Sequence, residues 1–355
     1  MWKKGFYVLS LLLGLALGTL VIARFGGLAK ALAVVRDIGW VGLGVYLLNA
    51  SLTLAAPAVG WWILARGEGS ALALRTTVRA NLMGFPLNFF MPSLYLGAEP
   101  LKVFYVAAVH GEPKRRILAT VIVAKFQELG GHILVMLVAA GVSLWRLEFT
   151  RRQEILLVTS MALITLLFAL TLYAFAGNLR PTVRIINLLA GFRILRRRMA
   201  GLRSRAEEME RLIHEAFTRR WKTFLAAQAV TTLSALSVLV RPLIFFGFTG
   251  HRIVLPLEHL CAIFLITNVI NILPHTPGAL GIFEIGMVGF FAASGIGREN
   301  AAAYSLVSRT ADLAFILLGL WLIVQAGMQA AARRVAGGAT KGLAEEERNG
   351  PKPPA

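Results

Sequence analysis

Long apolar runs are the feature that most constrains how this chain can fold. A helix that crosses a bilayer needs about 20 consecutive, mainly apolar residues. Six runs are this long or nearly so, and they span residues 6–24, 39–65, 117–145, 154–176, 222–249 and 300–330. Each run predicts a transmembrane helix, because a helix satisfies its backbone polar groups internally. Only 15% of the residues are charged, whereas soluble domains average about 25%.

Two further apolar stretches, 80–109 and 258–295, are interrupted in the middle, and each half is short for a full crossing. The interrupting residues are Asn88, Pro92, Gly97 and Pro100 in the first stretch, and Asn271, Pro274, Pro277, Gly278 and Gly281 in the second. We interpret both stretches as re-entrant or broken helical hairpins. The predicted fold is therefore an all-α polytopic membrane protein with about eight membrane segments, six of them full transmembrane helices.

The distribution of basic residues predicts the orientation. Lys3 and Lys4 place the N-terminus in the cytoplasm, and threading the six spans then puts 25 Lys and Arg residues on cytoplasmic segments and 8 on external ones. This asymmetry follows the positive-inside rule. It requires the first hairpin to open to the cytoplasm and the second to the exterior. The sequence thus predicts a multi-pass protein of a bacterial-type inner (plasma) membrane with both termini cytoplasmic.

The chain has a formal net charge of +19, and its longest hydrophilic stretch, 178–221 between the fourth and fifth spans, is rich in arginine. Apolar residues recur there at helical spacing, which predicts an amphipathic helix over 196–220. Its arginines, within 193–205, suit an anionic lipid leaflet. A solvated connector is the alternative, and no other feature supports nucleic-acid binding. The tail 333–355 is predicted to be disordered.

The order of the segments repeats. Residues 1–150 contain two spans, a hairpin and a span, and residues 151–332 contain the same order starting from the opposite side. Such inverted repeats are common in secondary transporters. The matching residues are Asn88, Pro92, Gly97 and Glu99 in the first hairpin and Asn271, Pro274, Gly281 and Glu284 in the second, followed by Lys125 and Glu128 in one span and Arg309 and Asp312 in the other.

Seven ionisable residues lie in the interior of the predicted membrane segments: Glu99, Lys102, Lys125, Glu128, Glu284, Arg309 and Asp312. Arg241 and Glu258 are assigned to span ends, where long side chains can reach the interface. Each of the seven costs at least about 2.5–3.5 kcal/mol at mid-bilayer when unpaired. We therefore expect them to pair with one another around a wet cavity, as a lipid head-group or translocation site. Structural ion pairs that lock the two halves together are the alternative. The single cysteine, Cys261, is expected to serve packing, and we predict no catalytic residue, metal site or cofactor.

Two sites in the hairpins have the features of helix starts, Glu99-Pro100 and Thr276-Pro277. A helix start inside the membrane presents free N–H groups, which favour phosphate or carboxylate. Together with Lys125 and Arg309, these starts favour the head group of an anionic or zwitterionic lipid.

These residues also carry a family resemblance. The segment from Asn271 to Glu284, followed by Arg309-Thr-Ala-Asp312, resembles the transmembrane region of lysylphosphatidylglycerol synthases, and Gly97-Ala-Glu99-Pro100-Leu-Lys102 resembles that region's first-half motif. The likeness covers roughly residues 5–330. The same region occurs alone in flippase-like membrane proteins, some of them associated with hopanoid biosynthesis. The synthases also carry a soluble aminoacyl-transfer domain that is not found in this sequence, so the resemblance implies lipid translocation rather than lipid synthesis.

The leading hypothesis is therefore a flippase-like protein that moves a membrane phospholipid or another polar lipid. Two alternatives remain open at this stage. One is an intramembrane lipid-modifying enzyme or a subunit of a lipid-biosynthesis complex, whose enzymes are then partners. The other is an ion-coupled transporter of a small amphiphilic solute, because internal charge pairs also suit coupling.

Overall fold

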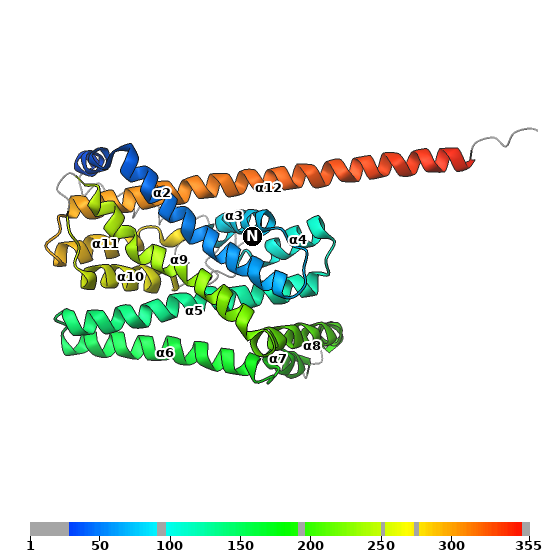
Figure 1. Ribbon diagram of the computed structural model, residues 1–355, viewed down its shortest axis with the longest axis horizontal. Coiled ribbons are helices and arrows are strands. Elements are labelled where there is room, and N and C mark those ends of the chain that lie inside the picture. Colours follow the sequence, from blue (N-terminus) through cyan, green and yellow to red (C-terminus); the bar gives the residue numbers. More distant parts are fainter. Residues whose placement is uncertain (1–27, 91–96, 191–195, 250–252, 273–276, 350–355) are drawn as a thin grey trace, which may run out of the picture.

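The computed structural model describes residues 28–90, 97–190, 196–249, 253–272 and 277–349, and every regular element in these ranges is a helix (Figure 1). The elements are α2 (Leu28–Gly67), α3 (Leu74–Phe90), α4 (Glu99–His110), α5 (Lys114–Arg146), α6 (Arg151–Ala176), α7 (Pro181–Ala190), α8 (Arg196–Thr218), α9 (Trp221–Gly247), α10 (Leu257–Ile272), the 3₁₀ turn η2 (Pro277–Ala279), α11 (Ile282–Ala293) and α12 (Arg298–Asn349). The predicted all-α polytopic fold is confirmed.

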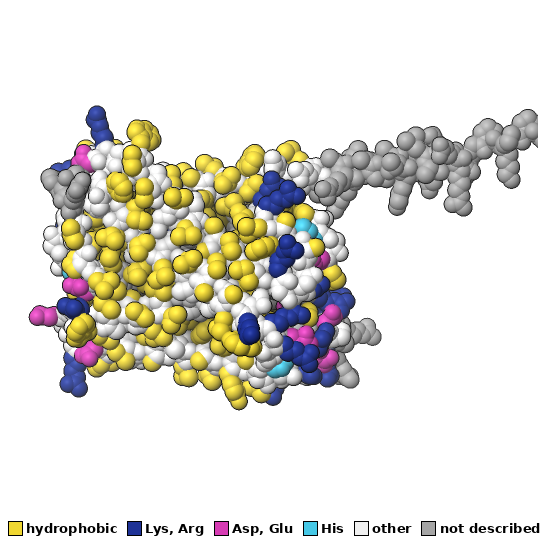
Figure 2. Space-filling model, in the orientation of Figure 1, with side chains coloured by type: hydrophobic (Ala, Val, Ile, Leu, Met, Phe, Trp, Pro, Cys, Tyr) yellow, Lys and Arg dark blue, Asp and Glu magenta, His cyan; other side chains and the backbone are white. Residues whose placement is uncertain are grey.

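Five of the described helices are long and apolar enough to cross a membrane: α2, α5, α6, α9 and α12. The outer face of α6 exposes large apolar side chains such as Leu163, Leu166 and Leu170. Figure 2 shows the corresponding surface, an apolar belt between two ends where charged side chains gather. Lipid is the solvent that suits such a belt. The predicted run 6–24 lies outside the described residues.

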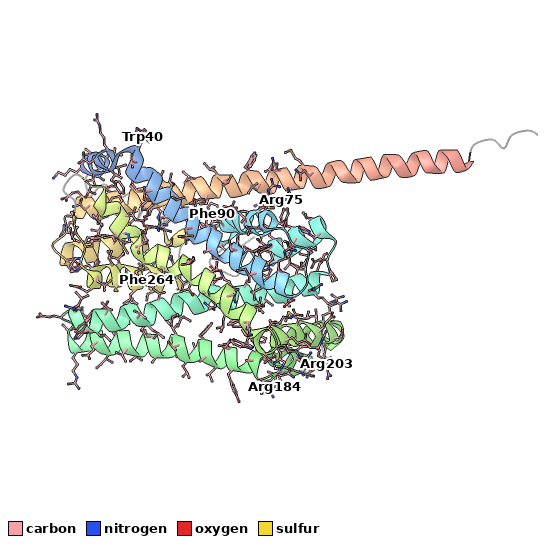
Figure 3. The ribbon with its side chains drawn as sticks, in the orientation of Figure 1. Trp40, Arg75, Phe90, Arg184, Arg203 and Phe264 are labelled. Carbon is pink, nitrogen blue, oxygen red and sulfur yellow. The ribbon has the colours of Figure 1, made fainter. Side chains whose placement is uncertain are left out.

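The second predicted span begins at a break within α2. Gly39 has φ 66° and ψ 177°, so the helical path is interrupted there and a leading segment from Leu28 is joined to the span. A positive φ costs a glycine little, because it has no Cβ. Trp40, at the start of the span, is fully exposed at the end of the molecule opposite Arg184 and Arg203 (Figure 3). This is a typical place for tryptophan at a membrane interface.

The two predicted hairpins are helix pairs that occupy opposite ends of the bundle. Helices α3 and α4 lie toward the end that carries α8, and α10 and α11 lie toward the other end (Figure 1). Both pairs are broken within the predicted stretches 80–109 and 258–295. Pro92 and Pro274 lie outside the described residues. The interruptions in hydropathy thus correspond to the breaks between these short helices.

Helices from one half of the chain pack against helices from the other half. The central contact joins α2 to α9. Helix α5 packs against α9 and α10, whereas α12 packs against α2 and α3, so the last span of each half contacts the first hairpin helix of the other. Within each half, the second hairpin helix packs on the last span, as α4 does on α5 and α11 on α12. The two charged spans are thus held by equivalent neighbours.

The amphipathic segment forms α8, but its apolar side faces protein. Leu212, Ile213 and Phe217 pack in a cluster with Ala119 and Val123 of α5. The sequence prediction placed this face on lipid, and the structure corrects it: α7 turns the chain back so that α8 lies against α5, α6 and α9. Its exposed side carries arginines, Arg203 among them.

Helix α12 continues beyond the bundle to Asn349 (Figure 1). The sequence predicts a disordered tail from residue 333, and the structure differs from this prediction over the described part. Alanine, arginine and glutamate are frequent in this segment. These residues have high helix propensity, so a helix can propagate from the preceding span without tertiary contacts.

Candidate functional site

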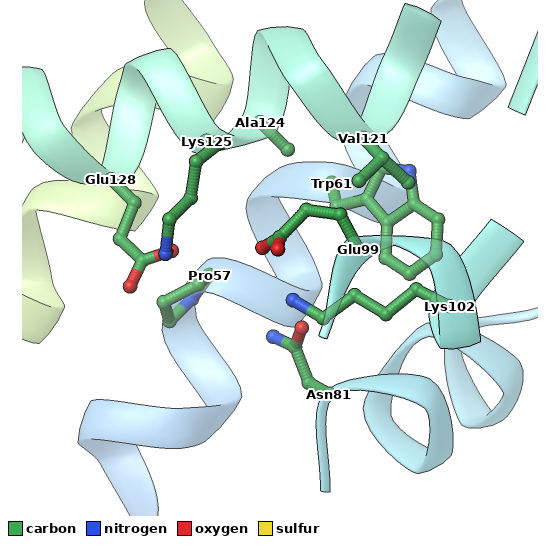
Figure 4. A pocket seen from close by; sticks show the side chains of 9 residues that line it. All are labelled: Pro57, Trp61, Asn81, Glu99, Lys102, Val121, Ala124, Lys125 and Glu128. Carbon is green, nitrogen blue, oxygen red and sulfur yellow. The ribbon is translucent and has the colours of Figure 1, made fainter. Parts of the chain in front are cut away.

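Four charged residues of the first half surround one pocket (Figure 4). Glu99 and Lys102 come from α4, and Lys125 and Glu128 come from α5. The enclosed space of the pocket has room for about one water molecule, and it reaches about 270 Å³ only when open solvent at its mouth is included. Its remaining lining residues are Pro57, Trp61, Asn81, Val121 and Ala124. Polar and charged side chains therefore make up more than half of the lining, which is unusual inside an apolar bundle.

Local structure explains why these side chains point inward. Glu99 lies in the first turn of α4, where the positive end of the helix dipole stabilises a carboxylate. The turn is fixed because Asn88 Oδ1 accepts a hydrogen bond from the backbone N–H of Ala98 at 3.0 Å. Gly84 of α3 allows α4 to approach, since a Cβ there would lie 3.0 Å from Lys102 Cε. Asn88 therefore links the end of α3 to the start of α4.

Burial and pairing differ among the four. Glu99, Lys102 and Lys125 are each less than 10% exposed. Lys125 Nζ donates to Glu128 Oε2 at 2.9 Å, the predicted base–acid pair one helical turn apart. Both carboxylate oxygens of Glu99 are buried without a hydrogen-bond partner among the described residues. The pocket therefore holds opposite charges that are only partly neutralised by one another.

The three charged residues of the second half form a closed network. Arg309 Nε donates to Glu284 Oε1 at 2.7 Å, and its Nη1 donates to Asp312 Oδ2 at 3.4 Å. The same guanidinium donates to two backbone carbonyls, those of Gly278 at 2.8 Å and Ala279 at 3.4 Å. It thereby fastens α12 to both the 3₁₀ turn and α11.

The start of α11 differs from the prediction. The sequence places a helix start at Thr276-Pro277, whereas the α-helix begins at Ile282 with Gly281 at the N-cap. Glu284 Oε2 accepts the N–H of Gly281 at 2.6 Å, so the chain's own carboxylate takes the place predicted for a phosphate. Positive φ at Gly278 and Gly281, 60° and 83°, delays the helix.

The remaining hairpin residues act through the backbone. A Cβ at Gly278 would collide with the ring of Phe89 in α3, so this glycine brings the two hairpins together. Gly97 lies in a bend before α4, Pro100 in the first turn of α4, and Asn271 near the end of α10. The structure thus brings the seven predicted charged residues together as a group of four and a group of three, and every residue lining the pocket belongs to the first half.

Similarity to known proteins covers both groups. The family model of the lysylphosphatidylglycerol synthase transmembrane region matches residues 8–319, which is most of the chain. The chain belongs to this family. The predicted family resemblance is confirmed, and the matched range contains all seven charged residues.

Other members of this family have known sequences. One UPF0104 membrane protein of Methanothermobacter thermautotrophicus is 24% identical over 303 residues, which cover 81% of this chain and 84% of the relative. A second from the same organism is 24% identical over 325 residues, covering 91% and 90%. No solved structure matches the chain. The family therefore supports a multi-pass membrane protein with a lipid-related role.

Sequence reasoning missed a further cation between the helices, the partly buried Arg241 of α9. It was assigned to a span end, but its Nη2 donates to Thr53 Oγ1 at 2.5 Å and its Nε donates to Asn49 Oδ1 at 3.4 Å. Tyr46 and Ser308 hydrogen-bond alongside, with 2.6 Å between their oxygens. The signal in the sequence was the row of Asn and Thr residues inside the apolar run 39–65.

Among the described residues, no three or more His, Cys, Asp or Glu side chains are grouped so that they could hold a metal ion. Cys261 is buried in a hydrophobic cluster with Phe264 and Leu265 of its own helix.

Proposed function

We propose that this protein translocates a lipid by passing its polar head group through the charged interior while the acyl tails stay in the bilayer. The observation that carries the proposal is the first-half pocket, in which Glu99, Lys102, Lys125 and Glu128 are held between α4 and α5 inside an apolar belt. Ionisable groups at this depth are costly, so they usually mark a transport pathway or a binding site. Membership of a lipid-related membrane family supports a lipid as the cargo.

Access from both leaflets follows from the arrangement of the halves. We assign residues 1–150 and 151–332 to two repeats of inverted topology, and their exchanged packing supports this assignment. The hairpins lie at opposite ends of the bundle (Figure 1). Rocking of one repeat against the other would open the charged interior to one leaflet at a time.

The charge distribution supports an inner-membrane location with both termini cytoplasmic. Lys and Arg side chains are dense at the α8 end and sparse at the opposite end (Figure 2). This asymmetry suits the positive-inside rule. The exposed side of α8, with Arg203 and Arg205, is then placed to attract anionic lipids of the cytoplasmic leaflet. Lipid-biosynthesis enzymes are natural partners because they would supply the cargo.

A reconstitution experiment tests translocation. The double variant Lys125→Gln/Glu128→Gln removes both members of an ion pair, so neither member is left without the other and the variant should fold. We expect vesicles with wild-type protein to move a tail-labelled fluorescent phospholipid between leaflets, measured by quenching with a membrane-impermeant reductant. The double variant should lose this activity, because the pocket loses two of its four charged side chains.

A matched control keeps the substitutions but moves them to the surface. Lys222→Gln/Glu207→Gln neutralises two exposed residues and should translocate like the wild type. Full activity of the buried double variant, at equal protein in the vesicles, would contradict the proposed pathway. Wild-type vesicles no faster than empty ones, for several lipid head groups and with or without an ion gradient, would contradict translocation itself.

A further inference from the structure

The two charged groups occupy equivalent places in the halves, yet their hydrogen-bonding states are opposite. In the second half, Glu284 receives donors from Gly281 and Arg309, and Arg309 is shared among two carboxylates and two backbone carbonyls. The hydrogen-bonding groups of Glu284 and Arg309 thus find their partners within this group. It fastens α11 to α12 and has no bare carboxylate to offer a ligand.

The first half leaves a carboxylate bare. Glu99 is 8% exposed, and neither of its oxygens has a hydrogen-bond partner among the described residues. Figure 4 shows this carboxylate directed into the pocket, between Lys125 and Lys102. A buried carboxylate without donors is one of the most costly groups a membrane interior can hold. It is therefore the position at which a ligand's donor gains most.

A cation lies beside it. Lys102 is 9% exposed and also faces the pocket, where no described carboxylate lies within ion-pair distance of its ammonium. The pocket thus presents one acceptor and one donor that are not paired with each other. The four charged side chains sum to a formal charge of zero. An anionic ligand alone would add a negative charge next to Glu99, whereas a zwitterion keeps the sum at zero and pairs both groups.

We propose that the first-half pocket binds a zwitterionic aminophosphate head group, with a primary ammonium donating to Glu99 and the phosphate accepting from Lys102. The assignment rests on the proposed function only in taking the head group to belong to a lipid. The second-half group is then a structural fastener rather than a second binding site. The substrate class is accordingly a lipid such as phosphatidylethanolamine, not a purely anionic one.

Competitive lipid binding tests the assignment. The purified full-length protein in detergent is titrated with phosphatidylethanolamine and phosphatidylglycerol of identical acyl chains, and bound lipid is quantified by native mass spectrometry. We expect at least a tenfold preference for phosphatidylethanolamine. Glu99→Gln should remove this preference and leave phosphatidylglycerol binding intact or stronger. Equal binding of the two lipids by the wild type, or an undiminished preference in Glu99→Gln, would overturn the proposal.

Two further arms keep the test independent of folding. Glu207→Gln makes the same substitution at an exposed carboxylate of α8 and should keep the wild-type preference. If Glu99→Gln does not fold, the wild type alone decides: N-methylation of the amine up to phosphatidylcholine should weaken binding at least tenfold, because a quaternary ammonium cannot donate to Glu99. Equal affinity for the two lipids would refute the predicted hydrogen bond.

A soluble head-group analogue without acyl tails tests whether the ligand is a lipid or a free solute. Soluble phosphoethanolamine should displace the lipid only at far higher concentration, and equal potency would identify a free solute and overturn the lipid assignment. Translocation assays separate the two proposals. Selective binding without any lipid movement would remove the proposed function and leave the head-group assignment standing. Movement of all lipids regardless of head group would remove the head-group assignment and leave the proposed function standing.

Discussion

Arginine and lysine at equivalent positions explain why the two charged groups behave differently. Arg309 offers a planar fork of five donors, which reaches Glu284, Asp312 and two backbone carbonyls at once. Lys125 offers a compact ammonium, which pairs with Glu128. Sequence spacing predicted both base–acid pairs correctly but treated them as equal, because spacing places residues on one helix face without showing which carbonyls lie opposite.

A substitution that keeps the positive charge tests whether the planar guanidinium of Arg309 is needed. Arg309→Lys keeps the positive charge but cannot satisfy all four acceptors, so Glu284 and the carbonyls of the 3₁₀ turn lose donors. We expect the free energy of unfolding to fall by about 1–3 kcal/mol, the usual cost of leaving a buried acceptor without its donor. The thermal denaturation midpoint in detergent measures this change.

The matched control is Arg211→Lys, in an exposed ion pair with Glu215 on α8. Exposed pairs contribute less than about 1 kcal/mol, so its denaturation midpoint should barely move. An Arg309→Lys midpoint equal to that of the control would show that the network does not stabilise the fold.

At the scale of the elements, proline and glycine determine how closely helices approach. Pro86 inside α3 cannot donate to the carbonyl of Leu82 four residues earlier. That carbonyl faces Gly319 of α12, where a Cβ would collide with it and would lie 2.7 Å from Pro86 Cδ. The sequence predicted interruptions in the hydropathy of the two hairpin stretches. It could not show that a break in one half is the contact surface for the last span of the other.

Gly319→Ala tests this contact. The added methyl must push α12 from α3, and overpacking of this kind costs about 1–3 kcal/mol. We expect a lower denaturation midpoint for Gly319→Ala. Gly327→Ala in the same helix has nothing within 4 Å of the new Cβ and should hold or raise the midpoint, because alanine favours helix over glycine by about 0.5–1 kcal/mol. Equal midpoints for the two variants would mean that α3 and α12 do not pack closely in the membrane.

For the whole molecule, the order and length of the apolar segments were sufficient to predict an all-helical, multi-pass membrane protein. They were not sufficient to divide the charges correctly. A hydropathy pattern gives the faces of a helix but not its partners, so the exchange that puts α5 on α10 and α12 on α3 had to come from the structure. That exchange keeps each charged span within its own half's group, while apolar packing and hydrogen bonds such as Tyr46–Ser308 join the halves.

The orientation of the protein in the membrane is simple to test, because its single cysteine is buried. In a Cys261→Ser background, Arg205→Cys on α8 and Arg152→Cys at the start of α6 each introduce one exposed thiol at opposite ends of the bundle. The charge asymmetry requires the α8 end to be cytoplasmic. A membrane-impermeant maleimide should therefore label Arg152→Cys in intact cells and Arg205→Cys only after permeabilisation. The opposite pattern would invert the assigned topology and place the mouths of the two hairpins on the wrong leaflets for the proposed pathway.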